Sequence, residues 1–290
     1  MTAGLQRFGE TCGPAKRRGR ETRAERAQSA QPALLQQLLD RLVALMAARG
    51  NVAMKLLRPE LSSLLALSEE LDRQGRRERT LSVAYDQLGD ASLRRGDLSG
   101  ATTYFQRALQ IDEAAAADPS DKQAQRDLSI SYERLGDVQL QSGQATEALG
   151  SYQKCLEIRQ KLAAADPSDA QALRDLSVSY NKLGDVQRRS GQTTEALGSY
   201  QKGLEISRKL AAADPSDAQA QLDLVFSFVK LGQVNQVANE FQKAIAWFEQ
   251  ALVILKRLKR EQRLAPVKQP WIAMAERFIA LCQKALAGSI

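Results

Sequence analysis

The side chains that most often carry chemistry are absent or scattered in this chain of 290 residues. Histidine is missing, which removes the Ser-His-Asp and Cys-His nucleophile pairs and the histidine-bearing zinc sites. Cys12, Cys155 and Cys282 lie far apart with no C-x-x-C spacing, so neither a disulfide framework nor a thiolate zinc cluster is expected. Acidic pairs exist, but they stand at salt-bridge spacing on predicted helices. We therefore predict that the protein is not an enzyme and has no catalytic residue, no cofactor and no metal site.

The apolar residues are not arranged to cross or enter a membrane. Residues 1–30 contain no apolar core of a signal peptide, and the most apolar stretch, 271–286, is interrupted by Glu276, Arg277 and Lys284. Together with the unpaired cysteines, this pattern predicts a cytoplasmic protein without a membrane span.

The formal charge of +7 is concentrated at the two ends of the chain. Residues 1–80 carry a net +6, residues 81–222 a net −4 and residues 223–290 a net +5. Basic segments therefore flank an acidic-to-neutral middle. Such ends can attract nucleic acid or an anionic surface, but a basic tail and solvated helix ends are the favoured explanation.

A sequence repeat dominates the middle of the chain. Residues 127–174 and 175–222 are two blocks of 48 residues that are identical at 37 positions. A looser copy begins at Leu81, and a degraded fourth copy begins at Asp223. Self-similarity at this period is typical of repeat proteins, in which each unit packs only against its neighbours.

Each unit reads as two helices. A Pro followed by Ser and, three residues later, Gln predicts a capped helix start at Ser120, Ser168 and Ser216. The first helix should end at a turn glycine such as Gly143, and the second carries apolar residues at helical spacing. No segment shows strand alternation, so the sequence predicts an all-α protein.

The residue pattern of each unit resembles the tetratricopeptide repeat. The pattern has an aromatic residue, Leu-Gly three residues on, a turn residue, then Ala, an aromatic and a small residue. Its positions are filled by Tyr85, Leu88, Gly89, Gly96, Ala101, Phe105 and Ala108; by Tyr132, Leu135, Gly136, Gly143, Ala148, Tyr152 and Cys155; by Tyr180, Leu183, Gly184, Gly191, Ala196, Tyr200 and Gly203; and by Phe228, Leu231, Gly232, Asn239, Ala244, Phe248 and Ala251.

The repeat period departs from that family, because it is 47 to 48 residues here against about 34 in the family. Elongated repeats of this kind are similar to those of kinesin light chains. The resemblance implies a right-handed α-α superhelix, a solenoid of about four helical-hairpin repeats with capping helices at the N- and C-terminal ends. It also implies that small residues such as Gly136 and Gly184 let two helix backbones approach closely.

The twin blocks differ mainly on one face of their first helix, within an arc of roughly 100° at 3.6 residues per turn. The resemblance implies that this face lines a concave groove that binds partner peptides. Neutral drift on a solvated face is the competing explanation. The candidate groove residues are Asp86, Asp90, Glu133, Asp137, Leu140, Gln141, Asn181, Asp185, Arg188, Arg189 and Gln233.

Carboxylates prevail among these groove positions, which predicts a partner with basic or hydrogen-bond-donor character. Arg134 and Lys182 stand three residues before Asp137 and Asp185, so pairing along the helix is the competing interpretation of the same residues.

The sequence thus predicts a non-catalytic adaptor or scaffold that binds a partner protein or peptide on the groove. The alternative is a regulatory subunit of a nucleic-acid-associated complex that uses the basic termini. A second candidate contact is a basic cluster near the end of the last repeat, formed by Lys256, Arg257, Lys259, Arg260 and Arg263.

The regions outside the repeats complete the predicted organisation. We expect a disordered basic arm over 1–30, a helical cap or degenerate repeat over 31–78, the repeat array over 79–264 and a C-terminal capping helix over 265–290.

Overall fold

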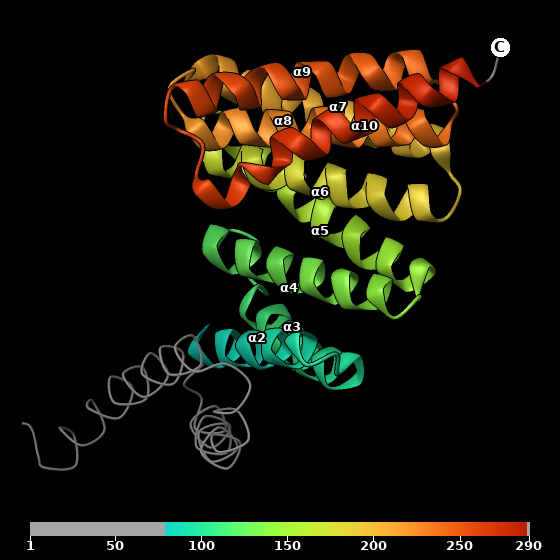
Figure 1. Ribbon diagram of the computed structural model, residues 1–290. Coiled ribbons are helices and arrows are strands. Elements are labelled where there is room, and N and C mark those ends of the chain that lie inside the picture. The colour runs from blue at the N-terminus through green and yellow to red at the C-terminus, as the bar shows by residue number, and fades with distance from the viewer. Residues whose placement is uncertain (1–78, 289–290) are drawn as a thin grey trace, which may run out of the picture. The chain divides into compact units, whose positions relative to one another are not determined.

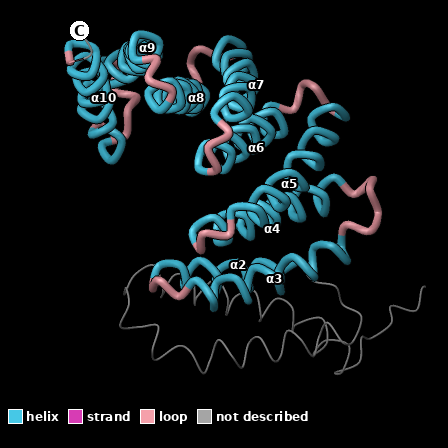
Figure 2. Tube along the Cα trace, turned by 90° about the vertical axis from the view of Figure 1, so that its right-hand side faces the viewer, coloured by secondary structure: helices cyan, strands magenta, loops and turns pink. Residues whose placement is uncertain are grey.

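The computed structural model describes residues 79–288. The predicted N-terminal arm and N-terminal cap lie outside these residues. The described residues contain nine α-helices, one short 3₁₀ helix and no β-strand (Figures 1 and 2). The helices are α2 (Arg79–Arg94), α3 (Leu98–Ala115), α4 (Lys122–Gln141), α5 (Ala145–Ala165), α6 (Ala170–Arg189), α7 (Thr193–Ala213), α8 (Ala218–Val237), α9 (Phe241–Arg260) and α10 (Pro270–Ala287), with η1 (Pro266–Lys268) before the last.

The helices form four hairpins that follow one another along the chain, namely α2/α3, α4/α5, α6/α7 and α8/α9. Each helix packs chiefly against the helices before and after it in the sequence. This arrangement confirms the predicted all-α repeat fold, because contacts between neighbouring units are what hold a solenoid together.

The turn inside each hairpin requires a left-handed backbone. Gly96, Gly143 and Gly191 have φ angles of 76°, 79° and 76°, which glycine adopts without a steric penalty. The fourth hairpin has Asn239 at this position with φ of 58°. Asparagine tolerates this conformation better than other residues with a Cβ atom. The turn residues of the repeat pattern therefore have a backbone role in all four units.

The helix starts differ from the prediction by one residue. The caps of α4, α6 and α8 are Asp121, Asp169 and Asp217, not the serines before them. The carboxylate of Asp169 accepts hydrogen bonds from the backbone N–H groups of Gln171 and Ala172. Aspartate is a favourable cap at this position, because its negative charge also interacts favourably with the positive end of the helix dipole. Ser168 instead donates to Asp166, and these hydrogen bonds lower the pKa of Asp166.

Each hairpin is closed by an aromatic ring of the second helix lying on a glycine of the first. Tyr152 and Tyr200 are almost fully buried. A Cβ atom added to Gly136 would lie 2.7 Å from the ring of Tyr152, and one added to Gly184 would lie 2.6 Å from the ring of Tyr200. The two helices can therefore approach this closely only because the first helix lacks a side chain at this point.

Helix α10 packs on the outer side of the last hairpin. The ring of Phe278 stacks on Phe248 with centroids 5.0 Å apart, and Cys282 is fully buried beneath it. Met274 and Leu281 of α10 remain exposed. We propose that α10 caps the array, since it covers apolar side chains of α9 that no further repeat covers.

The glycine contacts predict opposite effects for two alanine substitutions in the same unit. Gly184→Ala should lower the free energy of unfolding by roughly 1–3 kcal/mol, because the new methyl group overlaps the buried Tyr200 ring. Gly198→Ala is the matched control in a helix interior. No atom lies within 4 Å of its added Cβ, and it should stabilise by about 0.5–1 kcal/mol. Urea unfolding followed by circular dichroism measures both, and equal effects would contradict the packing role of Gly184.

Candidate functional site

The first helices α2, α4, α6 and α8 are joined by ion pairs between neighbouring repeats. The Arg134 guanidinium lies 2.6 Å from an Asp90 carboxylate oxygen. The Lys182 ammonium group lies 2.6 Å from Asp137, and that of Lys230 lies 2.7 Å from Asp185. The predicted pairing of Arg134 with Asp137 and of Lys182 with Asp185 along one helix is therefore wrong. Each base instead reaches the acid of the preceding repeat, because first helices lie side by side in the array.

The same aspartates also hold the hairpins together. The Tyr152 hydroxyl donates to Asp137 at 2.6 Å, and the Tyr200 hydroxyl donates to Asp185 at 2.7 Å. Burial, followed by the neighbouring carboxylate, raises the pKa of both tyrosines above the usual value. Asp90, Asp137 and Asp185 occupy the same position in the first three units, and each carboxylate already has a cationic partner in the fold.

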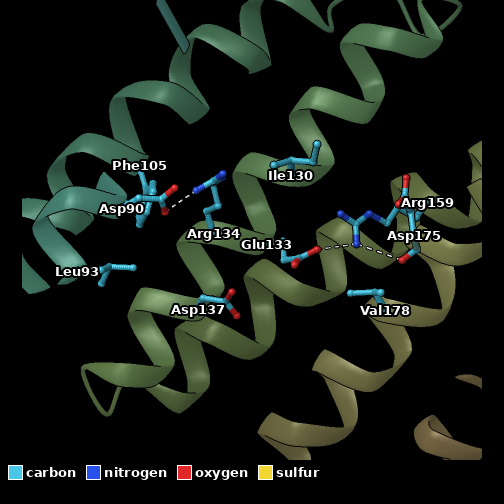
Figure 3. A pocket seen from close by; sticks show the side chains of 10 residues that line it. All are labelled: Asp90, Leu93, Phe105, Ile130, Glu133, Arg134, Asp137, Arg159, Asp175 and Val178. Atoms are coloured by element: carbon cyan, nitrogen blue, oxygen red, sulfur yellow. Dashed lines mark hydrogen bonds and ion pairs between the residues drawn. The ribbon is translucent and has the colours of Figure 1, made fainter. Parts of the chain in front are cut away.

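A cavity of about 360 Å³ opens between the first three of these helices (Figure 3). It brings together the predicted residues Asp90, Glu133 and Asp137. The prediction missed Arg159 and Asp175, which also line it. Its apolar wall is formed by Leu93, Phe105, Ile130 and Val178.

The other predicted groove residues lie elsewhere on or under the first helices. Gln141 and Arg189 are exposed near the ends of α4 and α6, whereas Asp86, Leu140, Asp185, Arg188 and Gln233 are half-buried. Asn181 is only 5% exposed, so its assignment to the groove surface is wrong. It faces α7, because a Cβ atom at Gly203 would lie 2.9 Å from its side-chain oxygen.

Arg159 is a buried cation at the junction of three helices. Its side chain is 5% exposed, and its guanidinium lies 2.7 Å from Glu133 of α4. It also donates to the Ser129 hydroxyl at 3.1 Å, to the Ser179 hydroxyl at 3.0 Å and to the backbone carbonyl of Asp175 at 3.1 Å. A buried charge needs this complete set of partners, since removing one leaves an uncompensated ion.

The next repeat replaces this charged network with small neutral groups. Asn181, Gly203 and Ser207 stand where the preceding unit has Glu133, Cys155 and Arg159. The Ser207 hydroxyl hydrogen-bonds with the hydroxyls of Ser177 at 2.9 Å and Ser227 at 3.1 Å. Three of the differences between the twin blocks are therefore one coordinated change of buried packing. The signal was present in the sequence as an Arg-to-Ser and a Glu-to-Asn change in the same unit.

This coordination predicts strongly non-additive effects on stability. Arg159→Ser alone should lower the free energy of unfolding by about 3 kcal/mol, because Glu133 loses its buried partner. The triple variant Glu133→Asn, Cys155→Gly and Arg159→Ser copies the next repeat and should recover most of that loss. Arg189→Ser is the exposed control and should change stability by less than about 0.5 kcal/mol. Chemical unfolding of the four proteins tests this, and additive losses in the triple variant would disprove the coupling.

Asp86 lies under Arg134, where its carboxyl group is largely shielded from water. Burial raises the pKa of Asp86 to about 7 from 3.8, although the Arg134 guanidinium at 3.2 Å opposes the shift. The nearby carboxylates of Asp112, Asp90 and Asp127 add to the increase. Because the folded protein holds this proton more tightly than the unfolded chain, ionisation of Asp86 costs stability.

The Asp86 shift predicts a specific pH dependence. Between pH 3.8 and about 7 the unfolded chain has lost this proton and the folded chain retains it, so the contribution of Asp86 to stability falls as pH rises. The stability of the wild type relative to Asp86→Asn should therefore decrease across this range and level off above it. Urea unfolding of both proteins in the same series of buffers measures the difference, and a pH-independent difference would contradict the shift.

The basic cluster of the last repeat is largely engaged within the protein. Arg257 donates to the Gln221 side chain at 2.6 Å, and Lys256 lies 2.8 Å from Glu276 of α10. Arg263 donates to the backbone carbonyls of Pro215 and Ser216. Lys259 and Arg260 are exposed in the last turn of α9, where cations complement the helix dipole. These contacts give the cluster a structural role and do not favour the nucleic-acid alternative.

Metal-ligand geometry, thiol environment and helix hydropathy can be stated for the described residues. Within 79–288 no group of three or more Cys, Asp or Glu side chains is arranged to hold a metal ion. Burial raises the pKa of the Cys155 thiol to about 11, which leaves it unreactive. No helix in the same part of the chain is long and apolar enough to span a membrane.

Comparison with known proteins supports the same class, a helical solenoid. The tetratricopeptide repeat family model matches residues 127–209. No curated protein sequence is significantly similar to the chain. Among solved structures, BtubC (BKLC) from P. vanneervenii is similar with a TM-score of 0.59 at 18% identity, covering 80% of this chain and 84% of that one.

Two further structures show the same fold. A Podosopora anserina kinesin light chain with nearly identical TPR-like repeats has a TM-score of 0.53 at 15% identity, covering 71% of this chain and 86% of its own. The apo form of RapI has a TM-score of 0.58 at 14% identity, covering 91% and 68%. The resemblance to tetratricopeptide repeats is thereby confirmed, with the family model matching residues 127–209 and the structures sharing the fold. Such repeats generally mediate protein–protein interaction, and non-catalytic scaffolds are the general case.

Proposed function

We propose that the protein is a non-catalytic adaptor or scaffold that binds a segment of a partner protein on its first-helix face. We define this face as the surface formed by α2, α4, α6 and α8. The single observation that carries the proposal is the cavity between α2, α4 and α6, which opens on this face and is lined from five helices. A surface built from several repeats can contact a continuous segment of another chain.

The packing of the array supports the first-helix face over the second helices. Its residues hold each other in place through ion pairs between repeats, so the surface is organised before a partner arrives. Pre-organisation favours binding, because fewer side chains have to be ordered on association. The cytoplasmic location inferred from the sequence fits an adaptor of this kind and is part of the proposal.

Site-specific photo-crosslinking tests the location of the partner without disturbing the fold. A photoreactive amino acid at Gln141, exposed at the end of α4, should crosslink to a partner in an extract of the source organism. The photoreactive amino acid in place of Gln153, which is exposed on α5, is the matched control and should give weak crosslinks. Mass spectrometry identifies the products. Equal crosslinking from both positions, or stronger crosslinking from Gln153, would place the binding surface elsewhere.

A further inference from the structure

An exposed apolar stripe runs across the first-helix face. Val83, Ile130, Val178 and Phe226 occupy the same repeat position, two residues before the aromatic of each first helix. Val83, Val178 and Phe226 are 44%, 36% and 45% exposed, and they are three of the eight large apolar side chains exposed in the described residues. Ile130 and Val178 also line the cavity (Figure 3). This position is thus apolar in all four repeats, exposed in three of them and half-buried at Ile130.

Ion pairs between repeats border the stripe on both sides. One row consists of the pairs already described, in which Arg134, Lys182 and Lys230 reach back to acids of the preceding repeat. A second row lies three to four residues before the stripe on each helix, and its bases reach forward to acids of the following repeat. Its pairs are Arg79 with Asp127 at 2.6 Å, Arg126 with Asp175 at 3.2 Å and Arg174 with Asp223 at 2.8 Å.

The two rows leave the stripe without an unmatched charge beside it. A charged side chain of a partner would have to displace a resident partner from one of these pairs. An apolar side chain needs no such exchange, and the burial of its apolar surface favours binding. The carboxylates that suggested a basic partner are therefore poor anchors. Val83 and Val178 are exposed between the two rows, and the Phe226 ring lies with its centroid 4.9 Å from the Lys230 ammonium nitrogen.

We propose that the stripe of Val83, Ile130, Val178 and Phe226 is the recognition element of the first-helix face, and that its ligand is an uncharged, apolar segment of a partner protein. The segment crosses the first helices in order and places an apolar side chain against Ile130 and Val178 at the apolar wall of the cavity. This inference rests on the proposed function, because it names the partner chemistry of the same face.

Selection from a random-peptide display library on the immobilised full chain tests the inference. The enriched peptides should be rich in apolar residues and poor in Lys, Arg, Asp and Glu. Synthetic copies of these peptides should keep their affinity for the full chain when the salt concentration is raised about tenfold, since apolar contacts are not screened. Val178→Asp and Val83→Asp should each weaken binding about tenfold or more.

Val253→Asp is the matched control, because Val253 is an exposed valine on a second helix. It should bind the selected peptides as the wild type does, with circular dichroism confirming that all variants fold. Peptides rich in Lys or Arg that bind more tightly to Val178→Asp would overturn the apolar inference and leave the proposed face intact. Peptides that bind all variants equally, or no enrichment at all, would also overturn it, and the crosslinking from Gln141 then decides the proposed function separately.

Discussion

The contact between an aromatic ring and a helix-interior glycine is the constraint on which the rest of this structure depends. Phe105, Tyr152, Tyr200 and Phe248 are almost fully buried, and each lies where a side chain on the facing glycine would collide with it. The contact brings the two helices of a hairpin together at one defined point. With every hairpin closed in the same way, successive first helices come side by side and their charged residues can pair between repeats.

Identical hairpins would give identical interfaces, yet the junctions between these repeats are chemically distinct. One equivalent buried position of the second helix carries Asp112, Arg159, Ser207 and Leu255 in successive units. A neighbouring position couples to the aromatic of the following unit: Glu113 accepts from the Tyr132 hydroxyl, Gln160 donates to the Tyr180 hydroxyl, and Arg208 lies over the ring of Phe228. Where the hydroxyl is lost, the partner becomes a cation that binds the ring face.

These junctions explain why one difference between the twin blocks does not mark a binding surface. Asn181 differs from Glu133 because the buried partner at the following helix also differs, not because a ligand requires it. The surface that remains after structural roles are assigned is the apolar stripe and the cavity beside it. The side chains of the stripe carry no formal charge, and those of Val83, Val178 and Phe226 are exposed, so their exposure is left to be explained by association.

The sequence by itself determined the all-α repeat, the hairpin turns at Gly96, Gly143 and Gly191, and the glycine and aromatic positions, because these depend on local backbone conformation and on a pattern repeated four times. It misplaced the helix caps by one residue, since serine and aspartate are both good caps and only the folded backbone selects between them. It also misassigned the partners of Arg134 and Lys182, because each has an acid three residues later on its own helix, at a spacing that permits pairing.

Only the tertiary structure decided that these bases reach the preceding repeat, that Arg159 and Glu133 form a buried pair, and that Val83, Val178 and Phe226 share one exposed face. These features depend on which helices lie side by side. The spacing of residues along one helix does not determine which residues of another helix come close to it.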